Sequence, residues 1–471
     1  MNDVTVFLPE LAVMAMAAVM FLLSLAKPDA RRDFGAALFF AAIIVAAAVA
    51  SLKSDAILFF GTYRVDIFSQ IFKAAIGLGL LLAITVCLDF KGVDEKYHGE
   101  YYLFMSTATL GLMMLVSSME LLTMYISLEL SSYSLYVMVP MRRGFAQDVE
   151  ASIKYVLFGA VSSCVMVFGL SFIYGLTHTT MLAEILPQVP ALIQQPLGLA
   201  AILLTLCGFF FKLTVFPFHS WAPDVYQGAA NETATFIATA PKVAAVALLL
   251  RLATLSGMDS VGVLKALAVL SAVSMTFGNL VAIVQKDLKR MLAYSSIAHA
   301  GYVIIGVLCL SELGYLSSIY YIFGYLLMNF AVFMVVVKVA QDGGNVSIEQ
   351  LSGLYKRAPL LALTLMLALF ALAGIPPSVG FVGKWMLFTA ALDRGYLWLV
   401  IIGAANSTIS LYYYLCVVRA AYCFEPGDRP AIAIDAPTRV MSYVMIAAII
   451  GVGVVPAPLV ELARTAARTL L

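Results

Sequence analysis

Apolar runs long enough to span a membrane follow one another along the whole 471-residue chain, with only short polar connections between them. The composition points the same way, because 63% of the residues are hydrophobic and 12% are charged, against about 25% charged in soluble domains. This pattern excludes a soluble enzyme, a nucleic-acid binder and a disordered scaffold. At about 20 residues per crossing, it predicts an all-α integral membrane protein with about 14 transmembrane helices, near residues 4–26, 34–52, 67–90, 101–118, 120–140, 152–176, 197–217, 233–255, 261–284, 291–311, 314–340, 358–391, 396–423 and 437–456.

No cofactor is expected in this chain. The six cysteines contain no C-x-x-C pair and lie almost entirely within apolar runs, which favours small buried hydrophobes over a disulfide framework or a metal centre. Haem in a helical bundle would need paired histidines within the spans, and the sequence offers none. A net charge of +1 gives no reason to expect nucleic acid as a partner.

Lysine and arginine are unevenly distributed between the two alternating sets of connections. The richer set includes Lys27, Arg31, Arg142, Lys289 and Arg357, and the positive-inside rule assigns it to the cytoplasm. We therefore expect a multi-pass protein of the bacterial inner (plasma) membrane with its N-terminus on the periplasmic side. The first apolar segment lacks a signal-peptide pattern and is expected to remain as a span.

Apart from lysines near the ends of spans, which are assigned to the connections, five lysines fall inside predicted spans, where a charge costs at least about 2.5–3.5 kcal/mol. Lys73 lies close to the start of its span, so we expect it to snorkel to the interface. Lys154 follows Glu150 by one helical turn, and an ordinary ion pair accounts for it. The remaining three, Lys212, Lys242 and Lys384, have no such explanation and are candidates for function.

Glu129 lies near the middle of its predicted span, on a stripe with Tyr125, Ser132, Tyr133 and Tyr136 at helical spacing. Burial disfavours the charged form of both a carboxyl group and an amine, so such groups can exchange protons near neutral pH. A purely structural, hydrogen-bonded glutamate is the alternative. We expect a lysine near Glu129 to titrate together with it.

Two spans carry helix breakers beside a lysine. Lys212 precedes Pro217, and Gly374-Ile-Pro-Pro precedes Lys384, about five spans later. An odd number of spans inverts the orientation, and inverted repeats with broken helices are typical of transporters. His299 lies beside Ser295 and Tyr302 on one helical face, where it is either a proton relay or a satisfied core histidine. His219 follows the first break and is the second auxiliary candidate.

Four long segments of this sequence resemble a known family. GFFFKLTVFPFHSWAPDVYQGA (208–229), ATAPKVAAVALLLRL (238–252), QKDLKRMLAYSSIAHAGYVIIG (285–306) and LAGIPPSVGFVGKWMLF (372–388) resemble the antiporter-like membrane subunits of proton-pumping NADH:quinone oxidoreductase, respiratory complex I. Within that group Val225-Tyr226, the APKVAA stretch and a lysine at 384 are most similar to subunit N. One departure is Ala230-Asn231-Glu232-Thr233, where the family commonly has Pro-Thr-Pro; it leaves the buried charges unchanged.

The resemblance implies fourteen helices and two inverted five-helix repeats with discontinuous helices near 197–230 and 358–391. It divides the chain into an N-terminal three-helix segment (1–100), a first repeat of spans 4–8 (101–255), a second repeat of spans 9–13 (256–424), and a C-terminal helix and tail (425–471). It also implies that Glu129, Lys212, Lys242 and Lys384 form a proton relay. The chain would then be a proton-translocating subunit without a redox centre.

The implied partners are neighbouring antiporter-like subunits, small membrane subunits and lipids, with quinone and NADH bound by other subunits. Three other interpretations stay open at this level. They are a subunit of a sodium/proton antiporter or membrane-bound hydrogenase, a subunit that binds quinone directly, and a passive scaffold. The passive-scaffold interpretation differs from the proton relay because it predicts that neutralising Glu129 or Lys212 leaves pumping intact.

Overall fold

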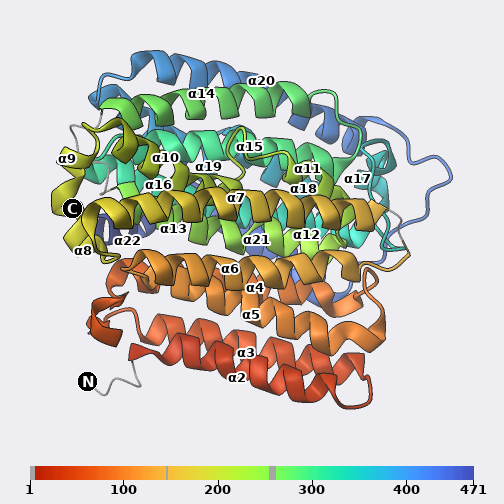
Figure 1. Ribbon diagram of the computed structural model, residues 1–471. Helices are drawn as coiled ribbons and strands as arrows, with labels where there is room; N and C mark the ends of the chain where they lie inside the picture. The colour runs from red at the N-terminus through yellow and green to blue at the C-terminus, as the bar shows by residue number, and fades with distance from the viewer. Residues whose placement is uncertain (1–5, 145–146, 254–260, 471) are drawn as a thin grey trace.

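The computed structural model describes residues 6–144, 147–253 and 261–470. Long helices lie side by side and nearly parallel through the whole molecule (Figure 1), and a single two-stranded hairpin is the only sheet in these ranges. Ten of the described helices are long and apolar enough to cross a membrane. The all-α membrane fold is therefore confirmed, while the count of about fourteen crossings stays a prediction.

The N-terminal segment contains α2 (Leu8–Ser24), α3 (Ala30–Ala50) and α4 (Ile67–Thr85). Between α3 and α4 lies the hairpin of β1 (Ala56–Leu58) and β2 (Tyr63–Val65), which pairs Ala56 with Val65. Asp66 starts α4 with a capping box. Its carboxylate accepts a hydrogen bond from the Ser69 amide, and the Ser69 hydroxyl accepts one from the Asp66 amide. Such a cap satisfies amides that the first helical turn leaves without partners.

The central part of the chain forms the bulk of the bundle. Its first half consists of α5 (His98–Ser117), α6 (Leu121–Met138), α7 (Gln147–Thr177), α10 (Pro196–Leu213), α11 (Trp221–Gly228), α12 (Asn231–Ala238) and α13 (Ala240–Ala253). Its second half consists of α14 (Val261–Ala282), α15 (Leu288–Leu308), α16 (Glu312–Val339), α18 (Pro359–Ala373), α19 (Val379–Asp393) and α20 (Leu397–Cys423). The predicted domain boundary at 255/256 lies outside the described residues. So do the start of the predicted span 4–26 and the end of the predicted span 233–255.

Short helices fill the connections at the two ends of the bundle. They are α8 (Leu182–Ile185), α9 (Val189–Leu192) and α17 (Leu354–Arg357), with 3-10 turns η1 (Phe59–Gly61), η2 (Val86–Asp89), η3 (Glu95–Tyr97), η4 (Val139–Met141), η5 (Leu186–Gln188) and η7 (Glu349–Leu351). The chain finishes with α21 (Ala436–Val454) and α22 (Ala457–Arg468), and α22 packs against α16.

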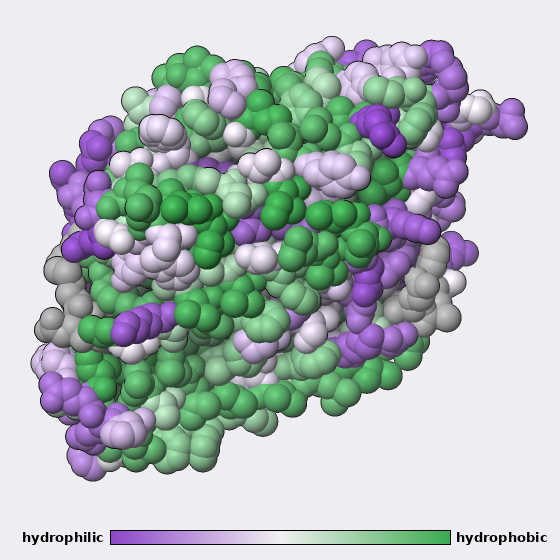
Figure 2. All heavy atoms as spheres, turned by 90° about the horizontal axis from the view of Figure 1, so that it is seen from above, coloured by the Kyte–Doolittle hydropathy of each residue, from purple (hydrophilic) through white to green (hydrophobic). Residues whose placement is uncertain are grey.

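The surface has the form expected of a membrane protein. In Figure 2 hydrophobic side chains cover the middle of the visible face, and hydrophilic side chains gather at its two ends. Exposed large hydrophobic residues lie on the outer helices, among them Phe39, Phe168, Ile401 and Val440. A lipid-facing band between two polar rims satisfies the requirement that no unpaired backbone or charged group faces hydrocarbon.

Two spans are broken in the same way, as the sequence predicts. Helix α10 ends at Leu213 because Thr214 adopts the left-handed conformation with φ of 65°, and α18 ends at Ala373 because Gly374 does so with φ of 89°. The chain then continues through a short loop of turns into α11 or α19. Cis peptide bonds precede Pro217 and Pro377 in the two loops. The breaks leave the last carbonyl groups of α10 and α18 without helical partners inside the bundle.

The second break depends on a close approach at Gly380. A Cβ atom added to this residue would lie 1.8 Å from the Ala371 carbonyl oxygen of α18. We expect Gly380→Ala to lower the free energy of unfolding by about 1–3 kcal/mol, because the two half-helices would have to separate. The melting temperature of the detergent-solubilised protein measures this. Gly451→Ala is the matched control, since nothing lies within 4 Å of its added Cβ atom; equal melting temperatures for the two variants would contradict the expectation.

The prediction for Lys73 was wrong. Its side chain does not reach an interface: it is fully buried and pairs with Glu10 of α2, Nζ to Oε1 2.6 Å. Because Glu10 comes from a helix distant in sequence, nothing local indicated this partner. The prediction for Lys154 is confirmed, since its ammonium lies 2.6 Å from Glu150, and it also reaches Asp224 of α11 at 2.6 Å.

Candidate functional site

Four ionisable side chains singled out from the sequence are buried in the middle of the bundle. Glu129 on α6, Lys212 on α10, Lys242 on α13 and Lys384 on α19 are all less than a tenth exposed. Each ammonium or carboxylate has polar partners, as a buried charge requires. The partners come from several helices and from the two breaks, and they arrange the four residues in a line.

The line begins at Glu129 and Lys212. Glu129 Oε1 accepts a hydrogen bond from the Ser163 hydroxyl of α7. Lys212 Nζ donates to the hydroxyls of Ser131 and Ser132 on α6, at 3.1 and 3.3 Å. The carboxylate and the ammonium are close enough to interact electrostatically, although these two described side chains form no direct ion pair. The lysine is therefore held by neutral hydroxyls beside a carboxylate, so a small movement can change their coupling.

Lys242 lies at the first break. Its Nζ donates to the Leu213 carbonyl oxygen at 3.2 Å and to the Thr214 hydroxyl at 2.7 Å. These are the last residue of α10 and the left-handed residue that follows it, so the ammonium caps the negative end of a half-helix. The left-handed Thr214 turns the chain away and exposes this carbonyl. Lys242 thus contacts Leu213 and Thr214, the two residues that directly follow Lys212 in the chain.

A small cavity joins Lys242 to His299 of α15. Its volume is about 10 Å³, and Ser296 and Tyr325 also line it. The hydroxyls of Ser296 and Tyr325 have no hydrogen-bond partner within the described protein. A cavity of about this volume accommodates one water molecule when two to four polar groups face it. The geometry therefore fits a single water bridging lysine and histidine.

His299 is held on both sides of its ring. Nδ1 lies 2.6 Å from the Tyr321 hydroxyl of α16, and Nε2 lies 3.2 Å from the Tyr414 hydroxyl of α20. The ring is buried and lies within electrostatic range of both Lys242 and Lys384. A neutral imidazole with a hydroxyl at each nitrogen can accept a proton on one side and release one on the other.

Lys384 repeats at the second break what Lys242 does at the first. Its Nζ donates to the carbonyl oxygens of Leu372 and Ala373, at 3.1 and 3.0 Å, which end α18. The same ammonium lies over the ring of Tyr302, 4.6 Å from its centroid. Tyr302 is one helical turn beyond His299, with ring centroids 6.0 Å apart. Hydrogen bonds, ring contacts and one small cavity therefore lead in steps from Glu129 and Lys212 to Lys384.

His219 lies apart from this line. Its ring stacks on Phe216 and meets the edge of Phe277, with centroid distances of 5.2 and 4.7 Å. No contact joins it to Lys212 or Lys242 among the described residues. The structure thus brings five of the six predicted residues together and leaves His219 outside.

Several partners in the line were not predicted. Ser131, Ser163 and Ser296 each stand beside another serine in a helix, and Thr214 follows the last residue of α10. Nothing in the sequence separates these four from the other serines and threonines. Tyr414 directly follows Tyr413, which shares a helical face with Asn406 and Ser410, so helical spacing favours Tyr413 rather than Tyr414 as a polar residue facing the bundle. Within the described residues, no group of His, Cys, Asp and Glu side chains could hold a metal ion.

Fold and site together define a class of protein. It is a helical membrane protein in which two broken spans and a line of buried acid–base groups occupy the centre of one bundle. Amines, an imidazole and a carboxylate are groups that can exchange protons when they lie close together. Comparison with known proteins narrows this class.

The family model described as NADH:quinone oxidoreductase/Mrp antiporter, TM matches residues 118–410. Subunit N 2 of NADH-quinone oxidoreductase from Syntrophobacter fumaroxidans is 47% identical over 467 residues, 99% of each chain. The subunit of the same name from Opitutus terrae is 44% identical and covers 97% of this chain and 96% of its own. The chain belongs to the family of antiporter-like membrane subunits, in the subunit N group of NADH-quinone oxidoreductase.

Solved structures agree with this assignment. A chain of respiratory complex I from Thermus thermophilus with bound aureothin superposes with a TM-score of 0.83 at 31% identity, covering 96% of this chain and 98% of that one. A chain of the Mrp complex from Dietzia has a TM-score of 0.84 at 19% identity, covering 100% and 98%, which shows the shared fold alone. Both belong to multisubunit membrane assemblies.

Proposed function

We propose that this chain is a proton-translocating membrane subunit of an NADH-quinone oxidoreductase and that it carries no redox centre of its own. The observation that supports this most directly is the line of buried acid–base groups from Glu129 to Lys384. Retaining three ammonium groups at this depth costs several kcal/mol, which a passive scaffold would have no reason to bear. The proposed direction of coupling is from quinone reduction elsewhere in the complex to proton movement here.

The relay works by changes in proton affinity along the line. When Glu129 is close to Lys212, its negative charge stabilises the ammonium; when the two separate, the ammonium loses that support and releases its proton. The proton passes to Lys242 at the first break, through the small cavity to His299, and on to Lys384. Moving one charge against a membrane potential of 100 mV costs about 2.3 kcal/mol, which a change of about two pKa units at one site can supply.

The orientation and the assembly are part of the proposal. The connections rich in lysine and arginine lie at one end of the bundle, which supports a cytoplasmic location for that end and a periplasmic N-terminus in a bacterial inner membrane. The matching breaks in α10 and α18 support two inverted repeats, 101–255 and 256–424, flanked by 1–100 and 425–471. Neighbouring membrane subunits of the complex are the proposed partners, with NADH and quinone bound by others.

The test uses inverted membrane vesicles carrying Glu129→Gln or Lys212→Met. We expect NADH-driven acidification of the lumen and quinone reduction to fall together several-fold, since the two processes are coupled and a block in proton transfer also slows the redox reaction in the assembled complex. Glu349→Gln, an exposed residue on the cytoplasmic end, is the control and should match wild type. Normal rates in both relay variants would contradict the proposal and favour a scaffold. Sodium-dependent transport without NADH oxidation would instead favour an antiporter.

A further inference from the structure

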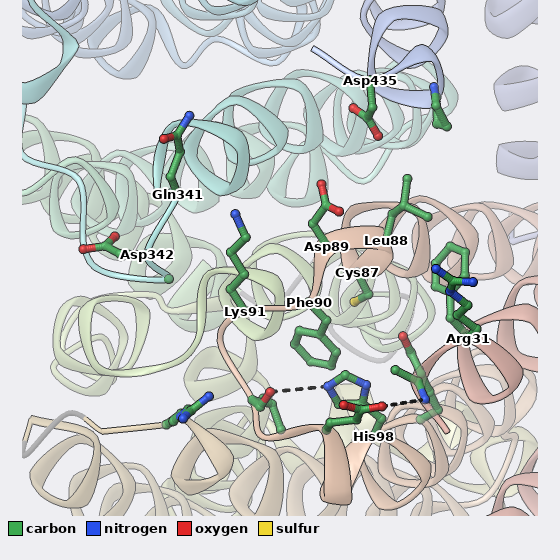
Figure 3. A pocket seen from close by; sticks show the side chains of 18 of the residues that line it. Arg31, Cys87, Leu88, Asp89, Phe90, Lys91, His98, Gln341, Asp342 and Asp435 are labelled. Atoms are coloured by element: carbon green, nitrogen blue, oxygen red, sulfur yellow. Dashed lines mark hydrogen bonds between the residues drawn. The ribbon is translucent and has the colours of Figure 1, made fainter. Parts of the chain in front are cut away.

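A polar cavity of about 1030 Å³ lies at the end of the bundle that we assign to the cytoplasm (Figure 3). It is bounded by α3, by the segment from η2 to η3, by the loop that follows α16 and by the start of α21. Side chains of both charges surround it, among them Asp89, Asp342, Asp435, Arg31 and Lys91, with His98 at its floor. Tyr102 also lines it, and this buried hydroxyl has no hydrogen-bond partner in the described protein.

Glu232 lies directly behind the wall of this cavity. Lys91 and Val93 line the cavity, and a Cβ atom added to Gly92 between them would lie 2.6 Å from Glu232 Oε2. The Glu232 side chain is 2% exposed, and its Oε2 atom has no hydrogen-bond partner among the residues that the structure describes. An ionised, incompletely hydrogen-bonded carboxylate at such a place is costly.

The charged groups around Glu232 act on it through space. Lys289 of α15 is fully buried and donates to the Ala229 carbonyl oxygen at 2.7 Å. Arg142 donates to the Gln227 and Gly228 carbonyl oxygens at 2.8 and 3.0 Å. These two cations favour the charged carboxylate, whereas burial favours the protonated one, so both forms are accessible. Glu232 and the ionisable groups around it form a cluster. The other members are Cys87 of η2, Tyr101 and Tyr102 of α5, Arg142, Asp287 and Lys289.

Asp287, at the start of α15, belongs to the same cluster. Burial raises the pKa of this carboxyl above its ordinary value, against the opposing effects of the Arg290 amide and the Lys289 charge. The cluster therefore holds two carboxyl groups and two cations in a poorly solvated place. A proton added to Glu232 changes the balance of charge for all of them.

A polar face of α12 leads from Glu232 toward Lys242. Asn231, Thr235 and Thr239 are spaced by four residues, and the two threonine hydroxyls donate to the carbonyl oxygens one turn earlier, each at 2.8 Å. The helix is interrupted at Thr239, with φ of −116° and ψ of −88°, immediately before Pro241 and Lys242. Ten residues separate Glu232 from Lys242, which is about 15 Å along a helix.

We propose that Glu232 is the cytoplasmic proton-loading site that supplies Lys242. A proton from water in the cavity converts the Glu232 carboxylate to the carboxylic acid. It then leaves for the neutral Lys242 amine, which becomes an ammonium, and the carboxylate is restored; one proton enters and one moves on. This inference rests on the proposed function, since it assigns the entrance of the same relay.

The test is a pH profile of Glu232→Gln in inverted vesicles, whose outer face is the cytoplasmic one. Without the loading site, the relay is refilled only by protons taken directly from cytoplasmic water, so we expect the pumping rate to follow the outside proton concentration, falling about tenfold for each unit by which the outside pH rises. Wild type should vary far less over the same range. Glu232→Asp, which keeps the carboxyl group, should recover most of the wild-type profile, and Glu349→Gln should match wild type throughout.

Infrared difference spectra of the wild-type complex give a second measurement that does not depend on how well the glutamine variant assembles. We expect a carboxylic-acid C=O band that titrates with outside pH and shifts in Glu232→Asp. A wild-type pH profile in Glu232→Gln, or a band unaffected by Glu232→Asp, would overturn the inference. If Lys242→Met blocks pumping while Glu232→Gln does not, only this inference fails. If neither variant has an effect, the relay itself fails.

Discussion

Lys242→Met is expected to lower NADH-driven lumen acidification and quinone reduction together by about a hundredfold, the usual contribution of a positioned acid–base group. The reason is its place in the line. Its Nζ contacts the break that follows Lys212 and lines the cavity shared with His299, so it alone joins the two halves of the relay among the described residues. Glu129→Gln should have a smaller effect, because Lys212 remains in place.

The variant Lys242→Arg tests whether this position must exchange protons or must only carry a positive charge. An arginine keeps the positive charge near the α10 carbonyl groups but does not release its proton at any physiological pH. If Lys242 exchanges protons, the arginine variant should be as inactive as the methionine variant. Activity close to wild type in Lys242→Arg would show instead that a permanent charge at this break suffices. Lys53→Met, an exposed lysine outside the bundle core, is the control for the loss of a lysine as such.

The second large effect concerns stability. Glu10 and Lys73 form a fully buried ion pair, and the Tyr63 hydroxyl donates to the same Glu10 oxygen at 2.5 Å. Removing one partner of a buried pair leaves an uncompensated charge and costs about 3–5 kcal/mol. We expect that loss in the free energy of unfolding for Lys73→Met or Glu10→Gln alone, measured by denaturant titration in mixed micelles. The double variant should recover most of it, since no isolated charge remains.

An exposed pair in the same protein serves as the control for this double-mutant cycle. Lys356 and Glu425 lie 2.6 Å apart, but their side chains are 46% and 76% exposed. Solvent screens such a pair, so its coupling energy should be about 0–1 kcal/mol. A coupling energy for Glu10 and Lys73 as small as that of the exposed pair would show that the buried pair is not needed to hold the N-terminal helices in place.

The sequence by itself determined the class of fold and the candidates for function. Apolar runs of membrane length predicted a helical bundle because a bilayer admits helices and closed barrels only. The breaks near Pro217 and Gly374 were predictable because proline and glycine act on their own turn of helix. Glu129, Lys212, Lys242 and Lys384 stood out because a charge in an apolar run is costly wherever its partners lie.

Only the tertiary structure decided which partner each charge has. Lys73 was expected at an interface and is instead paired with Glu10; Lys212 is held by hydroxyls rather than directly by Glu129. His299 joins the line through the cavity that it shares with Lys242 and through Tyr302, whereas His219 does not join it. The reason is physical: side chains that meet inside the bundle come from helices far apart in the sequence, and their depth and direction depend on how those helices pack.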